Sequence, residues 1–285
     1  MAQIIAILND KGGVAKTTTT ATLGTALWLL GKKVLLIDTD QQCNLTFMMD
    51  RTAMLDTQDN NNLYTWFHDS NCYPIFERYP GFDFIPSSRK MVDLQMELVS
   101  ASRREEKLKR LLSIVANEYD YIIIDCAPGG KNLVNQNVLV AADSIIIPTK
   151  TDIFTLQGTP NLLNFVQEIR NDWEKELPIL GYLLVSFEGG TKLGREVKGY
   201  FAGSQQDLGA PLLPIQIHKC QRCVEAPRDE QTVFEYAPDC TAADDYMMLA
   251  ERLCGIQPRK KNWTPSVWGQ KAKDAYDRFI IEREE

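Results

Sequence analysis

The chain contains 285 residues, of which 44% are hydrophobic, and it carries a formal net charge of −7 with a pI near 5.1. This length can bury one large core or two small ones, and the acidic balance excludes a protein that binds nucleic acid through its overall charge, so any such site must be a local basic patch. The sequence has no run of eighteen apolar residues and no charged-then-apolar leader, and its seven cysteines are scattered, so we expect a cytoplasmic protein with reduced thiols.

Short apolar runs rich in Ile, Val and Leu alternate with longer helical patterns along the chain. Runs that are apolar at every residue are typical of strands covered on both faces, and their alternation with helices predicts an α/β, doubly wound, mostly parallel sheet flanked by helices. Residues 50–80 have no clean period, and we expect a loop with short helices there. The predicted strands are 3–8, 33–38, 82–86, 121–125, 144–148, 179–186 and 212–217, and the predicted helices lie near 16–31, 91–117, 156–172 and 241–254.

The first predicted strand runs into a glycine-rich turn and then directly into a helix. Backbone N–H groups and the helix N-terminus would converge there on an anionic phosphate. Lys16 would neutralise terminal phosphates, Thr17 would give its hydroxyl to Mg²⁺, and Thr18 would reach an inner phosphate. Glycine-rich turns without function are common, but this order of strand, glycines, lysine and helix rarely arises by chance. The predicted phosphate loop is Gly12-Gly13-Val14-Ala15-Lys16-Thr17-Thr18.

Three aspartates follow predicted strands and would project from the carboxyl edge of the sheet. Strand 33–38 ends at Asp38, with Asp40 two residues on, and strand 121–125 ends at Asp125. This edge is where doubly wound sheets bind ligands. Each aspartate alone could instead cap the following helix. Together with a phosphate loop, they favour a magnesium–nucleotide site, with Asp125 holding the Mg²⁺ hydration shell.

The stretches KGGVAKTT, LLIDTDQQCN and YIIIDCAP together resemble the deviant Walker A branch of P-loop NTPases, and specifically the ParA/Soj partition ATPases. Two later stretches, NVLVAADSIIIPTKTDIFTLQG and CVEAPRDEQTVFEYAP, also resemble that family. The likeness runs from about residue 2 to 254. It implies an ATPase domain over 1–254 and a C-terminal extension, 255–285, whose amphipathic helix packs on the domain or on a dimer mate.

The resemblance implies an ATPase that binds Mg²⁺ and ATP and forms a sandwich homodimer with ATP. Lys11, the lysine before the glycines, would reach the phosphates of the other subunit, and Gly12 would be small because two phosphate loops approach there. Asp40 would orient the attacking water, and Asp38 would lie nearer the outer shell of the metal. The family's partners are non-specific double-stranded DNA on the nucleoid and a centromere-binding ParB-like protein.

Two of the chain's departures from the family pattern lie at candidate site residues. The Asp40 turn reads Gln41-Gln42-Cys43 where the family has proline, glutamine and glycine, so this loop would be less rigid. His218-Lys219-Cys220 stands where relatives have the Pro-Arg-Asn that cups adenine, which leaves His218 and Lys219 as candidate nucleotide contacts. A Cys-x-x-Cys pair, Cys220 and Cys223, lacks the second pair that a zinc site needs.

The resemblance also nominates DNA contacts in the C-terminal half. Arg222 aligns with a DNA-contacting arginine of the family, while Lys198, Lys219 and the run 259–261 are further candidates whose alternative is an ordinary solvated charge. The C-terminal tail presents one apolar helical face, and the charges around it are of both signs. This mixture favours packing against protein rather than binding to an anionic bilayer. The alternatives left open are a membrane-associated division-site regulator and a metabolic or metal-cluster member of the superfamily. The apolar face of the tail consists of Trp268, Ala272, Ala275, Tyr276 and Phe279.

Overall fold

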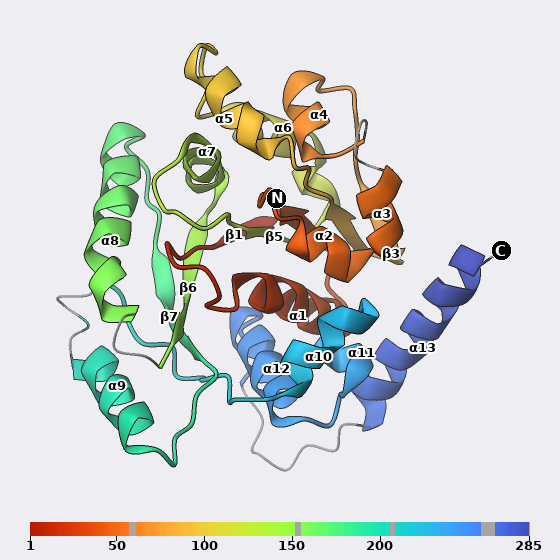
Figure 1. The fold of residues 1–285 in the computed structure, drawn as a ribbon, viewed down its shortest axis with the longest axis vertical. Coiled ribbons are helices and arrows are strands. Elements are labelled where there is room, and N and C mark those ends of the chain that lie inside the picture. Colours follow the sequence, from red (N-terminus) through yellow and green to blue (C-terminus); the bar gives the residue numbers. More distant parts are fainter. Residues whose placement is uncertain (57–60, 152–154, 204, 206–208, 258–265, 285) are drawn as a thin grey trace.

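The computed structural model describes residues 1–56, 61–151, 155–203, 205, 209–257 and 266–284. They form a seven-stranded sheet of order β3-β4-β2-β5-β1-β6-β7, parallel except for the antiparallel pairing of β3 with β4. The predicted doubly wound, mostly parallel architecture is confirmed (Figure 1). The strands are β1 Gln3–Ile7, β2 Val34–Asp38, β3 Phe76–Tyr79, β4 Phe82–Ile85, β5 Tyr121–Asp125, β6 Ser144–Lys150 and β7 Ile179–Val185.

Helices cover both faces of this sheet because successive strand residues point to opposite sides. Ile5 and Ile7 of β1 join one apolar cluster, whereas Ala6 and Leu8 join the other. The first cluster lies under α1 Lys16–Leu29, α2 Asn44–Met49, α3 Arg51–Asp56, α11 Val233–Tyr236, α12 Thr241–Leu253 and α13 Ser266–Glu284. The second lies under α4 Leu63–His68, α5 Met91–Val99, α6 Lys107–Val115, α7 Leu133–Ala141, α8 Thr155–Asp172 and α9 Lys192–Gly203.

The structure differs from the predicted secondary structure in three places. The segment 212–217 follows β7 through isolated backbone bonds, such as Leu213 N–H to Tyr182 C=O at 2.9 Å, but it is not a strand. Pro214 within it has no N–H with which to continue a ladder. The predicted helix 91–117 is broken between α5 and α6, where Arg103 adopts φ 49°. The region 50–80 contains the short helices α3 and α4, as predicted, but it also contains the unexpected edge strand β3, which turns into β4 at Gly81 with φ 79°.

The C-terminal helix α13 packs on the body of the molecule. Ala272, Ala275 and Phe279 are buried against the α1 side of the sheet, and Trp268 and Tyr276 are half-buried beside them. Gly269 lets the helix approach Pro238, since an added Cβ would lie 2.6 Å from that ring. Figure 1 shows the far end of α13 projecting beyond the body. The division into an ATPase domain over 1–254 and an extension over 255–285 stays a prediction.

Candidate functional site

The glycine-rich turn joins β1 to α1 at the carboxyl edge of the sheet. Gly13 and Ala15 adopt left-handed backbone conformations, with φ 71° and φ 63°. Ala15 is the N-cap of α1 and makes no side-chain capping bond, and the first turn of the helix holds no acidic residue. The first amides of α1 therefore keep their N–H groups available for an anion.

Lys16 closes the turn on itself. Its Nζ donates a hydrogen bond to the Lys11 carbonyl oxygen at 2.9 Å, and the side chain is buried at 7% exposure. Burial lowers the pKa of Lys16, while the nearby carboxylates, Asp125 foremost, act in the opposite direction. The ammonium thus stands at the centre of the turn, within the field of the buried acids.

Thr17 and Asp125 meet across the floor of the site. The Thr17 hydroxyl donates to Asp125 Oδ2 at 2.7 Å, but the buried Asp125 Oδ1 has no hydrogen-bond partner among the described residues. Burial and then the charge of Asp38 raise the pKa of Asp125 well above its usual range. A buried carboxylate oxygen without a donor fits the outer shell of a hard cation. In the described part of the chain, no three His, Cys, Asp or Glu side chains converge to hold a metal alone.

Asp38 is occupied in organising the next loop. Its Oδ1 accepts from the Asp40 backbone N–H at 3.0 Å, and its Oδ2 accepts from both the amide and the hydroxyl of Thr46 at 2.8 Å. Burial raises the pKa of Asp38 to about 7, against these hydrogen bonds, which lower it. Thr46 is a site residue that the sequence analysis missed. The only signal for it was a hydroxyl in the first turn of the helix after the aspartate loop.

The Asp40 loop forms a tight turn despite lacking the family's proline and glycine. Cys43 takes φ 55°, and its N–H donates to the Asp40 carbonyl at 2.9 Å. Asp40 Oδ1 accepts from the Gln42 N–H at 2.9 Å. A residue with a Cβ in this left-handed region costs roughly 1 kcal/mol or more, which the surrounding bonds must offset. The departure at Cys43 therefore places strain beside Asp40.

One cavity of about 710 Å³ brings the phosphate loop together with the distant segment that contains His218. Gly12, Gly13, Ala15, Lys16, Thr17, Thr18 and Asp40 line it from one side, and His218, Cys220, Cys223 and Tyr246 line it from the other. Both the backbone N–H and the Nδ1 of His218 lie 2.8 Å from Asp245 Oδ2. Asp245 lies in α12, so this helix fixes the orientation of the His218 ring.

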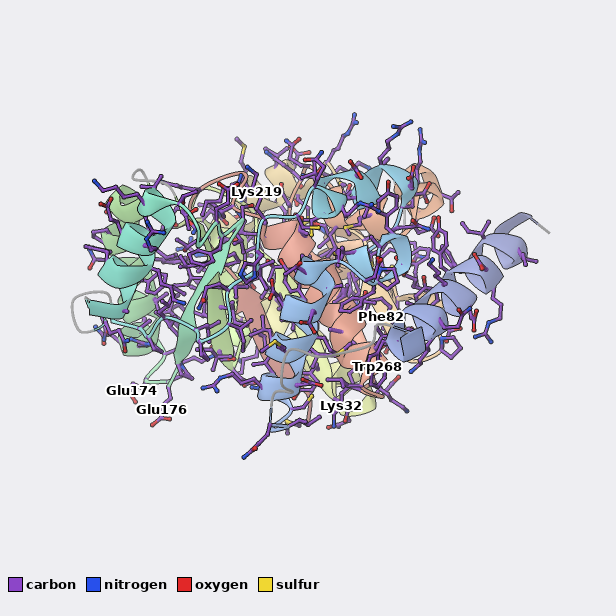
Figure 2. All side chains as sticks on the ribbon, turned by 90° about the horizontal axis from the view of Figure 1, so that it is seen from below. Lys32, Phe82, Glu174, Glu176, Lys219 and Trp268 are labelled. Carbon is purple, nitrogen blue, oxygen red and sulfur yellow. The ribbon has the colours of Figure 1, made fainter. Side chains whose placement is uncertain are left out.

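The other candidate cations lie outside the cavity lining. Lys219 pairs with Glu188 at 2.5 Å, Lys198 Nζ donates to Gln216 Oε1 at 2.7 Å, and Arg222 is exposed at the start of α10 Arg222–Glu225. Figure 2 shows Lys219 at the edge of the body opposite to Lys32, which follows the end of α1. Lys219 is therefore on the phosphate-loop edge. Residues 259–261 lie outside the described residues.

Comparison with known proteins decides the family. A model described as "AAA domain" matches residues 2–179. Sporulation initiation inhibitor protein Soj of Bacillus subtilis is 35% identical over 259 residues, covering 89% of this chain and 98% of that protein. The chain belongs to the ParA/Soj family of P-loop NTPases. Chromosome partitioning protein ParA of Caulobacter vibrioides is 30% identical over 262 residues, covering 88% of this ParA/Soj member and 93% of that protein.

A solved structure agrees with the fold of this ParA/Soj protein. Cobyrinic acid a,c-diamide synthase from Mycobacterium smegmatis, with bound ATP analogue and magnesium, matches with a TM-score of 0.75 at 24% identity and covers 91% of this chain and all of that one (100%). At this identity the likeness shows the fold alone. Among the described residues, no helix is long and apolar enough to cross a membrane.

Proposed function

We propose that this protein is a magnesium-dependent ATPase of a DNA-partition system, whose ATP-bound dimer binds duplex DNA without regard to sequence. The observation that carries the proposal is one cavity in which the phosphate loop faces Asp40 and the His218 segment, and whose lining residue Thr17 is hydrogen-bonded to the buried Asp125. The relatives in Bacillus subtilis and Caulobacter vibrioides support it, since the second is a chromosome partitioning protein. We expect a cytoplasmic, nucleoid-associated protein with a ParB-like centromere-binding partner.

The phosphate loop would hold the nucleotide by backbone amides and one ammonium. The Lys11 carbonyl, which now accepts from Lys16 Nζ, stands where a terminal phosphate oxygen would compete for the same donor. When ATP binds, Lys16 would exchange this neutral acceptor for a charged one, and a charge-assisted hydrogen bond is the stronger of the two. Gly12 to Ala15 would present their N–H groups to the bridging oxygens, and Thr18 would reach the inner phosphate.

Thr17 and Asp125 are the residues that would hold magnesium. The bound Mg²⁺ would neutralise charge on the terminal phosphate oxygens. Thr17 Oγ1 would turn from Asp125 toward the ion, and Asp125 would accept hydrogen bonds from its water shell through the oxygen that now has no partner. Both Asp38 oxygens are already bonded to protein groups, so we place Asp38 as the residue that positions Asp40 rather than as a direct ligand.

Asp40 would orient the attacking water, because it lines the cavity and its backbone is fixed by Asp38. One carboxylate oxygen accepts from the Gln42 amide, which sets the plane of the group. Hydrolysis would then depend on positioning and on charge, with little covalent chemistry for the protein to perform.

The base of the nucleotide would lie toward His218. The Asp245 carboxylate accepts from Nδ1 at 2.8 Å, so in the neutral ring Nε2 is a hydrogen-bond acceptor. An acceptor suits the exocyclic amine of adenine. Lys219 pairs with Glu188 and lies outside the cavity lining, so its part in nucleotide binding is the weaker proposal.

The DNA surface would lie beside this edge. Lys198, Lys219 and Arg222 are exposed on or near α9 and α10, and they would contact phosphates rather than bases. Because the protein is acidic overall, such a patch must act locally, and joining two copies would double its charge.

The oligomeric state and DNA binding with and without ATP test this function directly. We expect ATP with magnesium to convert a monomer, or weak dimer, into a dimer that binds duplex DNA of any sequence. Light scattering during gel filtration gives the mass, and fluorescence anisotropy with unrelated duplexes gives the binding and its salt dependence. Arg222→Glu should weaken binding to every duplex alike. ATP-dependent sedimentation with anionic vesicles, without DNA binding, would instead identify a membrane-associated regulator.

A further inference from the structure

Three cysteine thiols gather at the wall of the nucleotide cavity. Cys220 and Cys223 line the cavity itself, and Cys240, the N-cap of α12, packs beside them. All three are free and half-buried. The hydrogen bonds from His218 to Asp245 hold this segment against α12, and so bring Cys220 to the helix that starts after Cys240. The family resemblance assigns no role to any of these thiols.

The backbone between Cys220 and Cys223 suits a disulfide. The Cys223 N–H donates to the Cys220 carbonyl at 3.2 Å, which closes one turn between them. The two ends of such a turn have Cα atoms less than about 7 Å apart, and disulfides span Cα separations of about 4.4 to 6.8 Å. The Cys220 thiol also interacts with the thiols of both Cys223 and Cys240.

We propose that Cys220 and Cys223 form a redox-modification site, and that their disulfide lowers the affinity of the cavity for nucleotide. Within the described residues, no cluster of His, Cys, Asp and Glu is placed to hold a metal ion. The chemistry that suits the pair is therefore thiol–disulfide exchange. The effect on affinity rests on the proposed nucleotide site, whereas the disulfide itself does not.

The oxidant is a small disulfide, such as oxidised glutathione. The Cys220 thiolate attacks one of its sulfurs, so a mixed disulfide forms and the first small thiolate leaves. The Cys223 thiolate then attacks the Cys220 sulfur, closes the internal bond and expels the second thiolate. The two thiol protons pass to the two leaving thiolates, so one disulfide is reduced for the one that forms. Burial, followed by the neighbouring thiols, raises the pKa of Cys223, so the second step should be slow near neutral pH.

Oxidation changes the cavity because the two sulfurs belong to its wall. A disulfide draws them to about 2.05 Å, closer than two unbonded sulfurs can approach, and tightens the turn that carries them. His218 is two residues before Cys220, and Val224 directly follows Cys223; both also line the cavity. Linkage then requires the reverse effect, since bound nucleotide must disfavour the disulfide by the same factor.

The test measures both sides of this linkage on the full chain. The protein is equilibrated in glutathione buffers of increasing oxidation, the disulfide is assigned by peptide mass spectrometry, and affinity for a fluorescent ATP analogue is measured at each point. We expect a Cys220–Cys223 bond, a loss of affinity of about fivefold or more that dithiothreitol reverses, and a redox midpoint shifted by nucleotide to the same extent. Cys220→Ser and Cys223→Ser should each abolish the response, and Cys72→Ser/Cys254→Ser, whose thiols do not line the cavity, should retain it.

The possible outcomes distinguish a failure of the redox inference from a failure of the proposed nucleotide-binding function. Absence of the Cys220–Cys223 bond at every buffer ratio, or its formation with no change in affinity, overturns the inference. A bond from Cys220 to Cys240 that Cys240→Ser removes would also overturn the assigned pair. A reduced, folded protein that binds no nucleotide overturns the proposed function and the effect on affinity, while the mass assignment still decides whether the pair is oxidised.

Discussion

Lys16 and Asp40 face the same cavity, but their surroundings predict different losses on mutation. Lys16 is the buried cation of the phosphate loop, so Lys16→Ala should weaken ATP binding by about tenfold or more, because a charged hydrogen bond is lost. Asp40→Ala should retain ATP and the dimer but lose turnover by about 100-fold or more. Nucleotide titration and single-turnover hydrolysis measure the two effects separately.

Asp40→Asn is the matched variant for the expected loss of turnover in Asp40→Ala. Its amide oxygen can still accept from the Gln42 N–H, so the turn is kept while the carboxylate charge is removed. If the charge orients and activates water, Asp40→Asn should be nearly as slow as Asp40→Ala. Near-normal turnover in both variants would remove Asp40 from the mechanism.

The raised pKa of Asp125 predicts that the stability of the fold depends on pH. Because its folded-state pKa is raised, the folded protein binds this proton more tightly than the unfolded chain does. The group therefore stabilises the fold fully below its unfolded pKa and loses that contribution as pH rises through the folded value. Asp38, with a pKa raised to about 7, acts in the same direction. Without ligands, the free energy of unfolding from these two groups should fall between about pH 4 and pH 8.

Asp125→Asn tests that dependence. The neutral amide removes the buried charge, and its oxygen can still accept from Thr17, so the ligand-free variant should be more stable than wild type at pH 8 by on the order of 1 kcal/mol and should unfold with a weaker pH dependence. Urea denaturation from pH 5 to pH 8 measures both. The same variant should gain less stability from ATP with magnesium. A variant that loses stability at pH 8 would show that this carboxylate is paired in the free protein.

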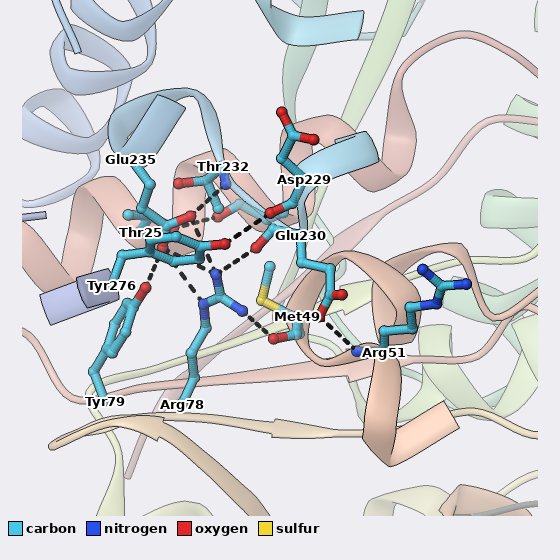
Figure 3. A network of polar contacts seen from close by, with 11 residues as sticks. Thr25, Met49, Arg51, Arg78, Tyr79, Asp229, Glu230, Thr232, Glu235 and Tyr276 are labelled. Atoms are coloured by element: carbon cyan, nitrogen blue, oxygen red, sulfur yellow. Dashed lines mark hydrogen bonds and ion pairs between the residues drawn. The ribbon is translucent and has the colours of Figure 1, made fainter. Parts of the chain in front are cut away.

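One buried arginine in β3, Arg78, links segments that are far apart in the sequence. Arg78 and Glu235 form an ion pair at 3.2 Å with both side chains fully buried. Arg78 also donates to the carbonyl oxygens of Met49, at the end of α2, and of Glu230 (Figure 3). It lies over the Phe279 ring of α13 with 5.0 Å to the centroid. This network joins the helix after the Asp40 loop to α11 and to the C-terminal helix.

Removing the cation alone should cost much of the fold's stability. Arg78→Met leaves Glu235 buried without its partner, so the free energy of unfolding should fall by about 3–5 kcal/mol. Arg78→Met/Glu235→Gln should lose less than the sum of the single changes, since the amide can still accept from the Thr232 N–H. Lys192→Met, which breaks an exposed pair with Glu196, is the control and should change stability by less than about 1 kcal/mol. A loss that small in Arg78→Met would contradict the account.

The same region shows where sequence reasoning ends. Runs such as YIIID are apolar at every position before the final aspartate, so the central strands and the aspartates at their ends could be placed from the sequence. The four residues of β3 read FERY, with two charges and no alternation, and the partner of Arg78 is 157 residues away. Thr46 was missed for the same reason, because its bonds to Asp38 depend on how α2 is placed. Partners set by tertiary contact leave no local pattern.

At the scale of the whole molecule, the phosphate loop is built to face outward. Gly12 is exposed, and a Cβ added to it would meet no described atom within 4 Å. Its φ is not among the positive values, so neither backbone conformation nor packing inside one copy requires glycine there. No hydrogen bond or ion pair of the Lys11 ammonium occurs within the described parts of the chain. A second copy that approaches this edge would explain both features.

Lys11→Ala is the decisive variant for that arrangement. The substitution keeps the Lys11 carbonyl that holds Lys16, so nucleotide binding by the monomer should remain, while ATP-dependent dimerisation is lost and stimulated hydrolysis falls by about 10³-fold. Lys11→Arg should not restore it fully, because a planar guanidinium must fit where a compact ammonium did. Lys32→Ala, at the opposite edge, is the control and should behave like wild type.

Mixing Lys11→Ala with Lys16→Ala subunits shows on which side the lysine acts. In such a heterodimer, the ATP held by the Lys11→Ala subunit still meets an intact Lys11 from across the interface, because the Lys16→Ala subunit lacks only its own nucleotide-binding cation. Hydrolysis at that one site should return in proportion to the mixed species, measured as phosphate release over a range of mixing ratios. Mixtures that show no more than the activity of the two separate variants would place Lys11 in its own site, and a Lys11→Ala protein that dimerises and hydrolyses like wild type would leave it a solvated loop residue.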